Sequence, residues 1–422
     1  MRGIVLGGGG SKGAYQIGAW QVMRERETEF QLVTGASIGA LNGAMMAQGD
    51  FDRARALWRT ITIDSVMEDG INLERSIQGM LNQAGELAPF LRRYIRYKGA
   101  DITPLRKLLE QVVQEERLRH SGIGFGLVTV QVPAMKGLEL PLREIPQGLV
   151  REYLLASAAC FPAFPMARIG GTLYIDGGYY DNLPIAFAFR EGAEEVIALD
   201  LDADICHREY YAHPYVTYIR PSWDLGSMLL FDRRVMEANR VLGYNDARKA
   251  LGDWFGFRFT FSGPAPERMY AQEAGRMSRL INRLEAGLSR RGEPLPLTRA
   301  LALHTEKALA PWEQLLRSLE IGGELLEVDH LRVRSVKELA ERLRERLLRE
   351  RGQEALFQRL RSLRHNTDLL AELRREPPIR LLACVSERIP RSTPEELSWM
   401  AANLPRELAG SLGLAAVYGE LK

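Results

Sequence analysis

A serine closely flanked by glycines is the strongest chemical feature of the chain. Gly35-Ala36-Ser37-Ile38-Gly39 follows an apolar segment, residues 30–34, and precedes residues 38–47, which are rich in alanine and methionine. A sharp turn between a strand and a helix needs small neighbours, because a Cβ would crowd the backbone, and it holds the serine oxygen out towards solvent. The positive end of the next helix then lies near a developing oxyanion. This context predicts that Ser37 is a nucleophile, although a loop that merely contains glycine and serine would have the same composition.

A glycine-rich loop, Gly7-Gly8-Gly9-Gly10-Ser11-Lys12-Gly13, lies upstream of this motif. Its backbone N–H groups can converge on an anion, helped by the N-terminus of the following helix. One such anion is the oxyanion of a tetrahedral intermediate at Ser37. Another is a pyrophosphate, because the loop also has the G-x-G-x-x-G spacing of dinucleotide-binding proteins. That fingerprint expects an acidic residue at the end of the second strand, where this chain continues into the Ser37 motif. A P-loop expects Ser or Thr after its lysine, and here the lysine is followed by glycine. The oxyanion is therefore favoured.

A serine nucleophile needs a base that accepts its proton. Of the six histidines, only His120, His207 and His213 precede residue 263, and none belongs to a recognisable motif. Asp176 is the stronger candidate, because the apolar segment before it delivers the carboxylate to the end of a strand and Gly177-Gly178 then turns the chain. An ordinary Asp-Gly turn would have the same sequence, so this motif alone leaves both interpretations open.

Taken in order, these motifs resemble those of the patatin-like phospholipase family. The resemblance rests on Gly8–Gly13, Gly35–Gly39 and Asp176–Gly178, with the small-residue segment Ala156–Pro165 as a fourth match. It implies a three-layer α/β/α fold, lipid acyl ester substrates and a Ser-Asp dyad that works without histidine. Carried over by position, Ser37 is the nucleophile, Asp176 is the base, and the amides of Gly8, Gly9 and Gly10 form the oxyanion hole. The remaining motif residues support this site: Lys12, Gly13, Gly35, Gly39, Gly177 and Gly178.

Strands and helices are expected to alternate around these motifs, as in a parallel sheet with helices on its faces. Helices are expected at residues 13–23 and 38–47 and over most of residues 50–116, with Thr103-Pro104 as an N-cap and N1 pair. The expected strands are residues 3–6, 30–34, 125–132, 172–175, 196–201, 216–220 and 255–261.

The character of the chain changes after Gly263-Pro264, where Leu, Arg and Glu dominate and helices are expected. Ser335–Glu338 and Thr393–Glu396 are both capping boxes. We therefore expect an acyl hydrolase domain at residues 1–262 and a mostly helical domain of unknown role at residues 263–422. The Arg- and Glu-rich run at residues 332–364 would be an exposed ion-paired surface or an oligomer contact.

The composition of the chain indicates which kinds of binding partner and which cellular location are expected. The 422 residues include 56 basic and 54 acidic ones, for a net charge of +2, which gives no support for a nucleic-acid binder. Three separated cysteines, no secretory leader and no bilayer-length apolar run indicate a cytoplasmic protein. Residues 90–98 mix basic and aromatic side chains, as an interfacial helix at a membrane surface does, although a solvated helix face explains them as well. No cluster has metal-ligand spacing, so no metal or cofactor is expected.

The function expected from the sequence is a lipid acyl hydrolase that acts on phospholipids or related esters. A general carboxylesterase with little preference for membranes is one alternative. A lipid- or nucleotide-binding regulatory module that keeps the pocket without turnover is another, and the glycine-rich loop motivates it.

Overall fold

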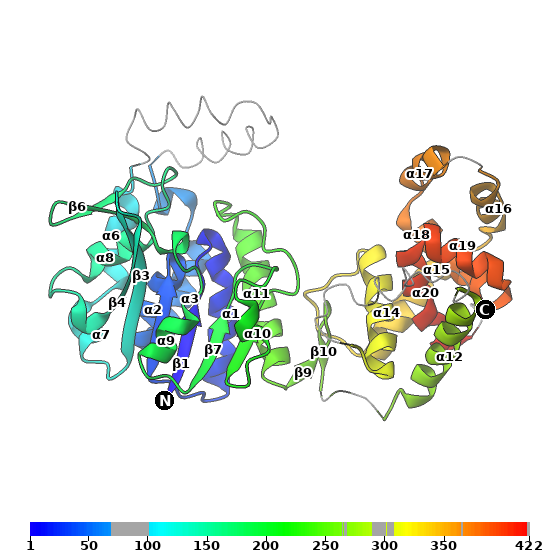
Figure 1. Cartoon of the computed structure of the whole chain (residues 1–422), viewed down its shortest axis with the longest axis horizontal. Coiled ribbons are helices and arrows are strands. Elements are labelled where there is room, and N and C mark those ends of the chain that lie inside the picture. The colour runs from blue at the N-terminus through cyan, green and yellow to red at the C-terminus, as the bar shows by residue number, and fades with distance from the viewer. Residues whose placement is uncertain are drawn as a thin grey trace. The chain divides into compact units, whose positions relative to one another are not determined.

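The computed structural model describes residues 1–68, 101–263, 265, 268–288, 301, 308–363 and 366–419 (Figure 1). The expected interfacial segment at residues 90–98 lies outside the described residues. Contacts between Cα atoms divide the chain into two compact units, Met1–Leu251 and Gly252–Lys422. In the described part of both units, no helix is long and apolar enough to cross a bilayer.

An eight-stranded mixed sheet forms the centre of the first unit, with the order β5-β6-β3-β2-β1-β7-β8 and β4 paired to β3. The strands β1, β2, β3, β7 and β8 pair in parallel, whereas β4, β5 and β6 join by antiparallel pairs. The bounds are β1 Arg2–Leu6, β2 Leu32–Ala36, β3 Gly124–Val132, β4 Lys136–Pro141, β5 Ala167–Ile169, β6 Thr172–Asp176, β7 Glu195–Leu199 and β8 Val216–Ile219.

The expected parallel sheet is therefore right for five strands and wrong at one edge, where β4 and β5 were also not expected. Both are largely half-exposed, so they lack the apolar runs that reveal the buried strands. The strand expected at residues 255–261 is also wrong. Two short strands, β9 Trp254–Phe255 and β10 Phe261–Ser262, pair antiparallel instead. Gly256, with a φ of +121°, follows β9 directly and helps to end it.

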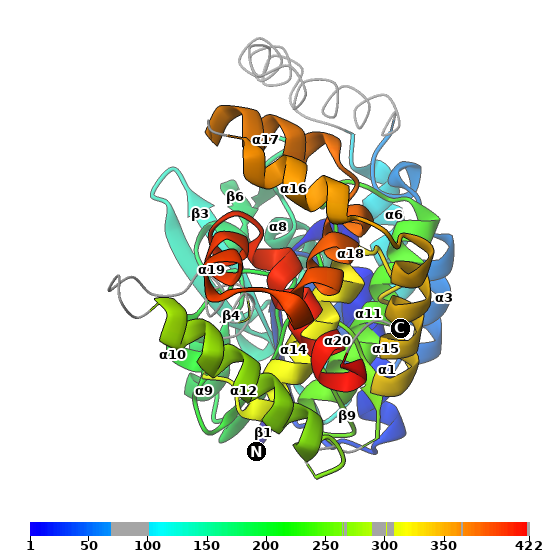
Figure 2. The ribbon, with the colours of Figure 1, turned by 90° about the vertical axis from the view of Figure 1, so that its right-hand side faces the viewer.

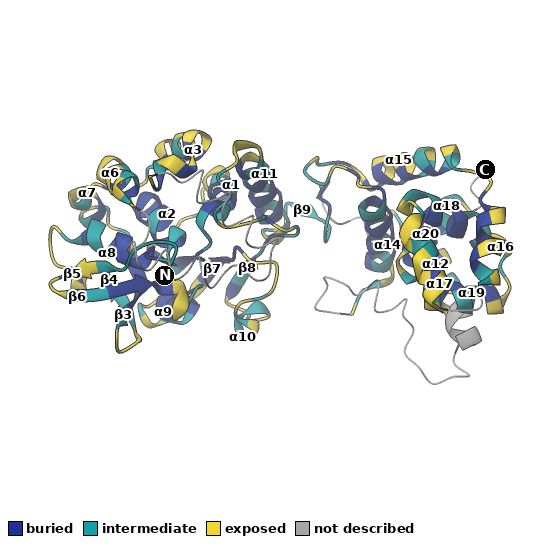
Figure 3. Cartoon of the chain, turned by 90° about the horizontal axis from the view of Figure 1, so that it is seen from above, coloured by how far each residue is buried: buried dark blue, intermediate teal, exposed yellow. Residues whose placement is uncertain are grey.

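Helices cover both faces of the sheet (Figure 3). The residues that α2 and α9 contact on the strands show this. A Cβ on Gly43 of α2 would contact Val33 and Phe125, whereas Phe187 of α9 packs against the backbone of Gly126. Successive residues of a strand point to opposite faces, so α2 and α9 lie on opposite sides and the three-layer α/β/α class is confirmed. The bounds are α1 Ala14–Glu25, α2 Ile38–Ala47, α3 Phe51–Thr60, α6 Thr103–Val112, α7 Glu115–Arg119, α8 Val150–Ser157, α9 Ile185–Arg190, α10 Arg208–Tyr211 and α11 Arg233–Ala250.

The expected start of α6 is one residue off. Ile102 occupies the N-cap position and Thr103 is already helical. The Asp101 carboxylate accepts the Thr103 amide at 2.8 Å, so the chain turns into the helix one residue earlier than the Thr-Pro pair indicates.

The second unit is mostly helical, as expected, and α14, α18 and α20 pack together in it (Figure 2). Both predicted capping boxes are confirmed, at the starts of α15 and α19. Glu320 of α14 is fully buried, and its carboxylate accepts the amides of Phe257 and Phe259. The bounds are α12 Ala271–Leu288, α14 Pro311–Leu325, α15 Val336–Arg349, α16 Glu354–Ser362, α17 Asn366–Arg375, α18 Pro378–Arg388, α19 Pro394–Asn403 and α20 Pro405–Tyr418.

Candidate functional site

Ser37 stands at the turn between β2 and α2, where its φ of +53° is unusual for a residue with a side chain. The turn is tight enough to exclude side chains at two neighbours. A Cβ on Gly35 would lie 2.5 Å from the Gly39 carbonyl carbon, and one on Gly39 would lie 2.2 Å from the Leu6 oxygen. The Ser37 amide donates to the Ser157 hydroxyl at 3.0 Å. The motif thus forms the strand-turn-helix geometry that its glycines predict.

Strand register explains why Asp176 lies beside this turn. Strand β2 ends with Ala36 opposite Val128 of β3. Strand β6, which runs antiparallel to β3, ends with Asp176 opposite Thr129. Two strands that arrive from opposite directions therefore end at consecutive residues of β3. The Ser37 side chain lies next to the Asp176 carboxylate and favours its charged form.

Asp176 is buried, with an exposed fraction of 6%. Burial raises the pKa of Asp176 to about 6, against hydrogen bonds from Ser37 and the Gly178 amide that favour the charged form. The Gly178 bond is 2.8 Å long. A carboxylate with a pKa close to neutral is a better proton acceptor than an exposed one, so the arrangement suits general-base chemistry on the serine.

Two further groups that titrate lie close to Asp176. Burial raises the pKa of the Cys160 thiol, and the Asp176 charge adds to this effect. The hydroxyl of Tyr179, which donates to the Phe161 carbonyl, lies 3.9 Å from the Cys160 sulfur. Burial also raises the pKa of Tyr179 to about 12. Both groups therefore stay protonated at neutral pH and add no charge next to the carboxylate.

The glycine-rich loop approaches the serine at Gly8, where a Cβ would lie 3.0 Å from the Ser37 Cβ. The Gly8 amide donates to the Asn182 carbonyl at 3.1 Å, and the Asn182 side chain donates back to the Gly8 carbonyl at 3.2 Å. The amides of Gly9 and Gly10 donate to no residue in the described part of the chain. They are therefore open to an anion, whereas the Gly8 amide is engaged.

Lys12 does not point a free charge at the serine. Its ammonium lies 2.8 Å from a carboxylate oxygen of Asp202. Gly13 instead serves packing, because a Cβ there would lie 2.7 Å from Ile38 and 2.8 Å from the Trp58 ring. These two motif residues thus shape the loop and its contact with α2 and α3.

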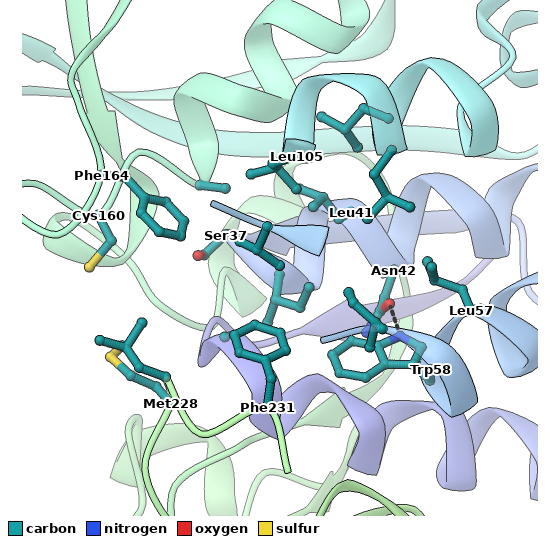
Figure 4. Close-up of a pocket in the computed structure, with 18 of the residues that line it drawn as sticks. Ser37, Leu41, Asn42, Leu57, Trp58, Leu105, Cys160, Phe164, Met228 and Phe231 are labelled. Carbon is teal, nitrogen blue, oxygen red and sulfur yellow. Dashed lines mark hydrogen bonds between the residues drawn. The ribbon is translucent and has the colours of Figure 1, made fainter. Parts of the chain in front are cut away.

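An apolar cavity with an empty volume of about 930 Å³, open solvent at its entrance included, begins at Ser37 (Figure 4). Cys160, Phe164 and Met228 lie on one side of the serine, and Leu57 and Trp58 lie on the other. Met228 is 41% exposed and Trp58 is buried, so the cavity opens near Met228 and closes at Trp58. The other side chains along its walls are also mostly apolar: Ile38, Leu41, Met45, Ile61, Val66, Leu105, Leu108, Leu109, Val112, Leu229 and Phe231.

Ser157 and Asn182 also hold the site together, and neither was among the predicted site residues. Ser157 belongs to the small-residue segment that carries part of the family resemblance. Asn182 follows Asp181, whose carboxylate accepts the Leu183 amide at 3.0 Å and so shapes the turn. His207 lies 3.0 Å from that same carboxylate oxygen, and this contact raises the pKa of His207. The histidine is thus engaged with Asp181.

The acidic residues after β7 do not assemble into an ion site. Asp200 is fully buried and accepts the Asp202 amide and the Tyr218 hydroxyl. Asp202 pairs with Lys12. Across the described residues, no group of three His, Cys, Asp or Glu side chains is arranged to hold a metal ion.

Comparison with known proteins finds a family match in the first part of the chain. Residues 4–189 match the family model "Patatin-like phospholipase". Human patatin-like phospholipase domain-containing protein 6 is 27% identical over 205 residues, which are 47% of this chain and 13% of that protein. Lysophospholipase NTE1 of Mycosarcoma maydis is 24% identical over 202 residues, 47% of this chain and 10% of that protein. Among solved structures, VipD from Legionella pneumophila aligns over 94% of this chain and 91% of its own, with 14% identity and a TM-score of 0.41.

The curated relatives are thus several times longer than the region that they share with this chain. The residues that match the family model, 4–189, contain the glycine-rich loop, the Ser37 turn and Asp176 in the order that the sequence resemblance requires. Residues 4–189 are therefore similar to the patatin-like phospholipase family.

Proposed function

We propose that the chain is a lipid acyl hydrolase in which Ser37 is the nucleophile and Asp176 is the general base. The observation that carries the proposal is the position of Ser37, which lines an apolar cavity and lies next to the buried Asp176 carboxylate. The family match supports lipid hydrolase activity in general terms. The cavity supports an acyl chain as the part of the substrate that is bound, since a long apolar pocket with few polar groups fits a hydrocarbon.

The proposed reaction has two halves. The Ser37 oxygen attacks the ester carbonyl carbon while Asp176 accepts the hydroxyl proton. The tetrahedral intermediate then breaks its bond to the alcohol, and Asp176 returns the proton to the leaving oxygen. In the second half, water attacks the acyl-serine and gives its proton to Asp176. The acyl–serine bond breaks, Ser37 recovers the proton, and the fatty acid leaves.

The negative oxygen of each intermediate needs hydrogen-bond donors that are in place beforehand. In this proposal, the amides of Gly9 and Gly10 supply them, together with the N-terminal end of α2. Gly8 contributes only if its amide leaves the Asn182 carbonyl, so its expected role as a third donor is the least supported part of the site. Removal of one such donor costs about 10²–10³ in rate in other enzymes.

The decisive experiment compares wild type, Ser37→Ala and a matched control, Ser121→Ala, in a turn away from the cavity. Hydrolysis of a p-nitrophenyl ester and labelling by a fluorophosphonate probe are measured together. We expect both in wild type and in Ser121→Ala, and neither in Ser37→Ala. Activity that survives in Ser37→Ala would refute the nucleophile, and a wild type without labelling would favour the non-catalytic binding module.

The preference for lipid surfaces is a separate part of the proposal. Met228 at the cavity entrance is 41% exposed, and Tyr179, just after Asp176, is 52% exposed. These side chains would contact the interface of a substrate layer. Rates on phospholipid vesicles and on a monomeric ester should therefore differ, with vesicles preferred. Equal or lower rates on vesicles would favour the general carboxylesterase. A cytoplasmic location and oligomerisation through the C-terminal helices stay predictions.

A further inference from the structure

Three buried polar side chains connect the closed end of the acyl cavity to the glycine-rich loop. The Trp58 indole N–H donates to the Asn42 side-chain oxygen at 3.0 Å, as the dashed line in Figure 4 shows. The Asn42 amide group donates to the Gln16 side-chain oxygen at 2.8 Å and to the Gly13 carbonyl at 3.1 Å. The Gln16 amide group donates to the Gly7 carbonyl at 2.8 Å. This Trp58–Asn42–Gln16 chain thus ends on the first and last residues of the loop.

The hydrogen-bonded Trp58–Asn42–Gln16 chain connects three helices, and it contacts both the acyl cavity and the glycine-rich loop. Gln16 lies on α1, Asn42 on α2 and Trp58 on α3, and their exposed fractions are 1%, 4% and 4%. One face of Trp58 lines the cavity, and its ring also packs directly on Gly13. A hydrocarbon chain in the cavity would therefore rest on a side chain that also supports the loop.

Buried hydrogen bonds of this kind are costly to leave unmade, so each member holds the next in place. Both loop ends are fixed by side-chain donors, whereas the amides of the proposed oxyanion donors, Gly9 and Gly10, donate to none of the described residues. The positions of those two amides depend on how firmly the loop ends are held. A displacement of an oxyanion donor by a fraction of an ångström lowers the rate without changing ground-state binding.

We propose that Gln16, Asn42 and Trp58 are positioning residues that fix the glycine-rich loop against the acyl cavity, so that Trp58 serves catalysis as well as acyl binding. This inference rests on the proposed function. It differs from a purely structural role, which would change stability alone, and from a purely wall-forming role of Trp58, which would change the KM of long esters alone.

The first test uses Trp58→Phe, which keeps an aromatic wall but removes the indole donor. Trp20→Phe is the matched control, because Trp20 is a buried tryptophan of the same unit that packs edge-on against Phe51 with ring centroids 5.2 Å apart. Gln16→Met is a second variant that keeps side-chain length and removes both hydrogen bonds of Gln16. Thermal denaturation first establishes that each variant is folded at the assay temperature.

Hydrolysis of p-nitrophenyl acetate and p-nitrophenyl decanoate then separates the roles. We expect kcat to fall about tenfold on both esters in Trp58→Phe and Gln16→Met, which is about 1.4 kcal/mol of transition-state stabilisation, with KM within about twofold of wild type. Trp20→Phe should keep the wild-type kcat. An effect on the decanoate alone, or an unchanged kcat on both esters, would overturn the proposal.

Hydrogen–deuterium exchange keeps the inference testable apart from activity. Peptides that contain residues 7–13 should exchange faster in Trp58→Phe and Gln16→Met than in wild type or Trp20→Phe. If wild type hydrolyses no ester and Ser37 is not labelled, the proposed function fails. The exchange data alone then still show whether the Trp58–Asn42–Gln16 chain holds the glycine-rich loop in place. Unchanged exchange in both variants would overturn the inference even if kcat falls.

Discussion

Replacing Asp176 with asparagine tests whether ionisation of the buried carboxylate lowers the free energy of unfolding. Its pKa is about 6 in the folded protein, against an ordinary value of 3.8. The difference is about 2, and each pKa unit corresponds to 1.36 kcal/mol. Ionised Asp176 therefore lowers the free energy of unfolding by about 3 kcal/mol. The carboxylate is 6% exposed, so solvent screening does not reduce this figure much.

The sign of the pH dependence follows from proton binding. Between pH 3.8 and about 6, the folded chain holds the Asp176 proton and the unfolded chain has lost it. Stability therefore falls as the pH rises through this window, and the loss is complete above pH 6. Asparagine has no charge to bury and can still accept the Gly178 amide. Asp176→Asn should match wild type near pH 3.5 and exceed it by up to about 3 kcal/mol near pH 7.5.

Exchange protection of peptides from β3 and β6, measured at increasing urea concentration, gives the stability of this unit in the full chain. Asp52→Asn is the control, because Asp52 lies on the surface of α3 with its side chain 89% exposed. The difference between variant and wild type cancels the titration of all other groups. An Asp176→Asn protein that is no more stable than wild type at pH 7.5, or a gain that does not vary with pH, would refute the reasoning.

Three further predictions concern the pH dependence of the reaction and two buried positions. Below about pH 6, kcat/KM on a monomeric ester should fall about tenfold per pH unit, because protonated Asp176 cannot accept the serine proton; a flat profile down to pH 4.5 would contradict the base. Gly39→Ala should cost about 1–3 kcal/mol by overpacking, since its Cβ would lie 2.2 Å from a backbone oxygen, whereas Gly43→Ala, whose nearest contact is a Val33 methyl at 3.1 Å, should cost less in urea denaturation. Glu320→Ala should destabilise the second unit by about 1–3 kcal/mol, because it removes the buried carboxylate that accepts the amides of Phe257, Arg258 and Phe259. Arg317 keeps its 2.8 Å ion pair with Glu324. Unchanged exchange protection of α14 would contradict this estimate.

The sequence predicts the elements that carry the site because each is marked by a run of apolar residues or by glycines at a turn that has no room for a side chain. Helix α2 was expected at residues 38–47 and is found there, and β6 differs from its expected bounds only by including Asp176. Strands β4 and β5 were not predicted, since edge strands need no continuous apolar run. The strand partners of β4 and β5 are known only once the order of the sheet is known.

The meeting of Ser37 with Asp176 has no local signal. It depends on β6 running antiparallel to β3 and stopping at Thr129, one residue beyond the point where β2 ends. The sequence resemblance places the two residues in one site, whereas periodicity predicts a parallel sheet and gives no register. The pairing of Gly8 with Asn182 is hidden for the same reason, because its partners are 174 residues apart.

If Asp176 is the base, as proposed, then the charges around it determine how well it accepts a proton. A cation close to Asp176 would lower its pKa and make it a poorer proton acceptor. Lys12 carries the one formal charge of the glycine-rich loop, and its ammonium is held at 2.8 Å by Asp202. His207 is likewise held by Asp181, and the ion pairs formed by the described residues include none to Asp176. The carboxylate is therefore tuned by burial and two hydrogen bonds alone. The same absence of a counter-ion that makes its ionised form costly for folding gives it the pKa that the proposed proton transfer from Ser37 requires.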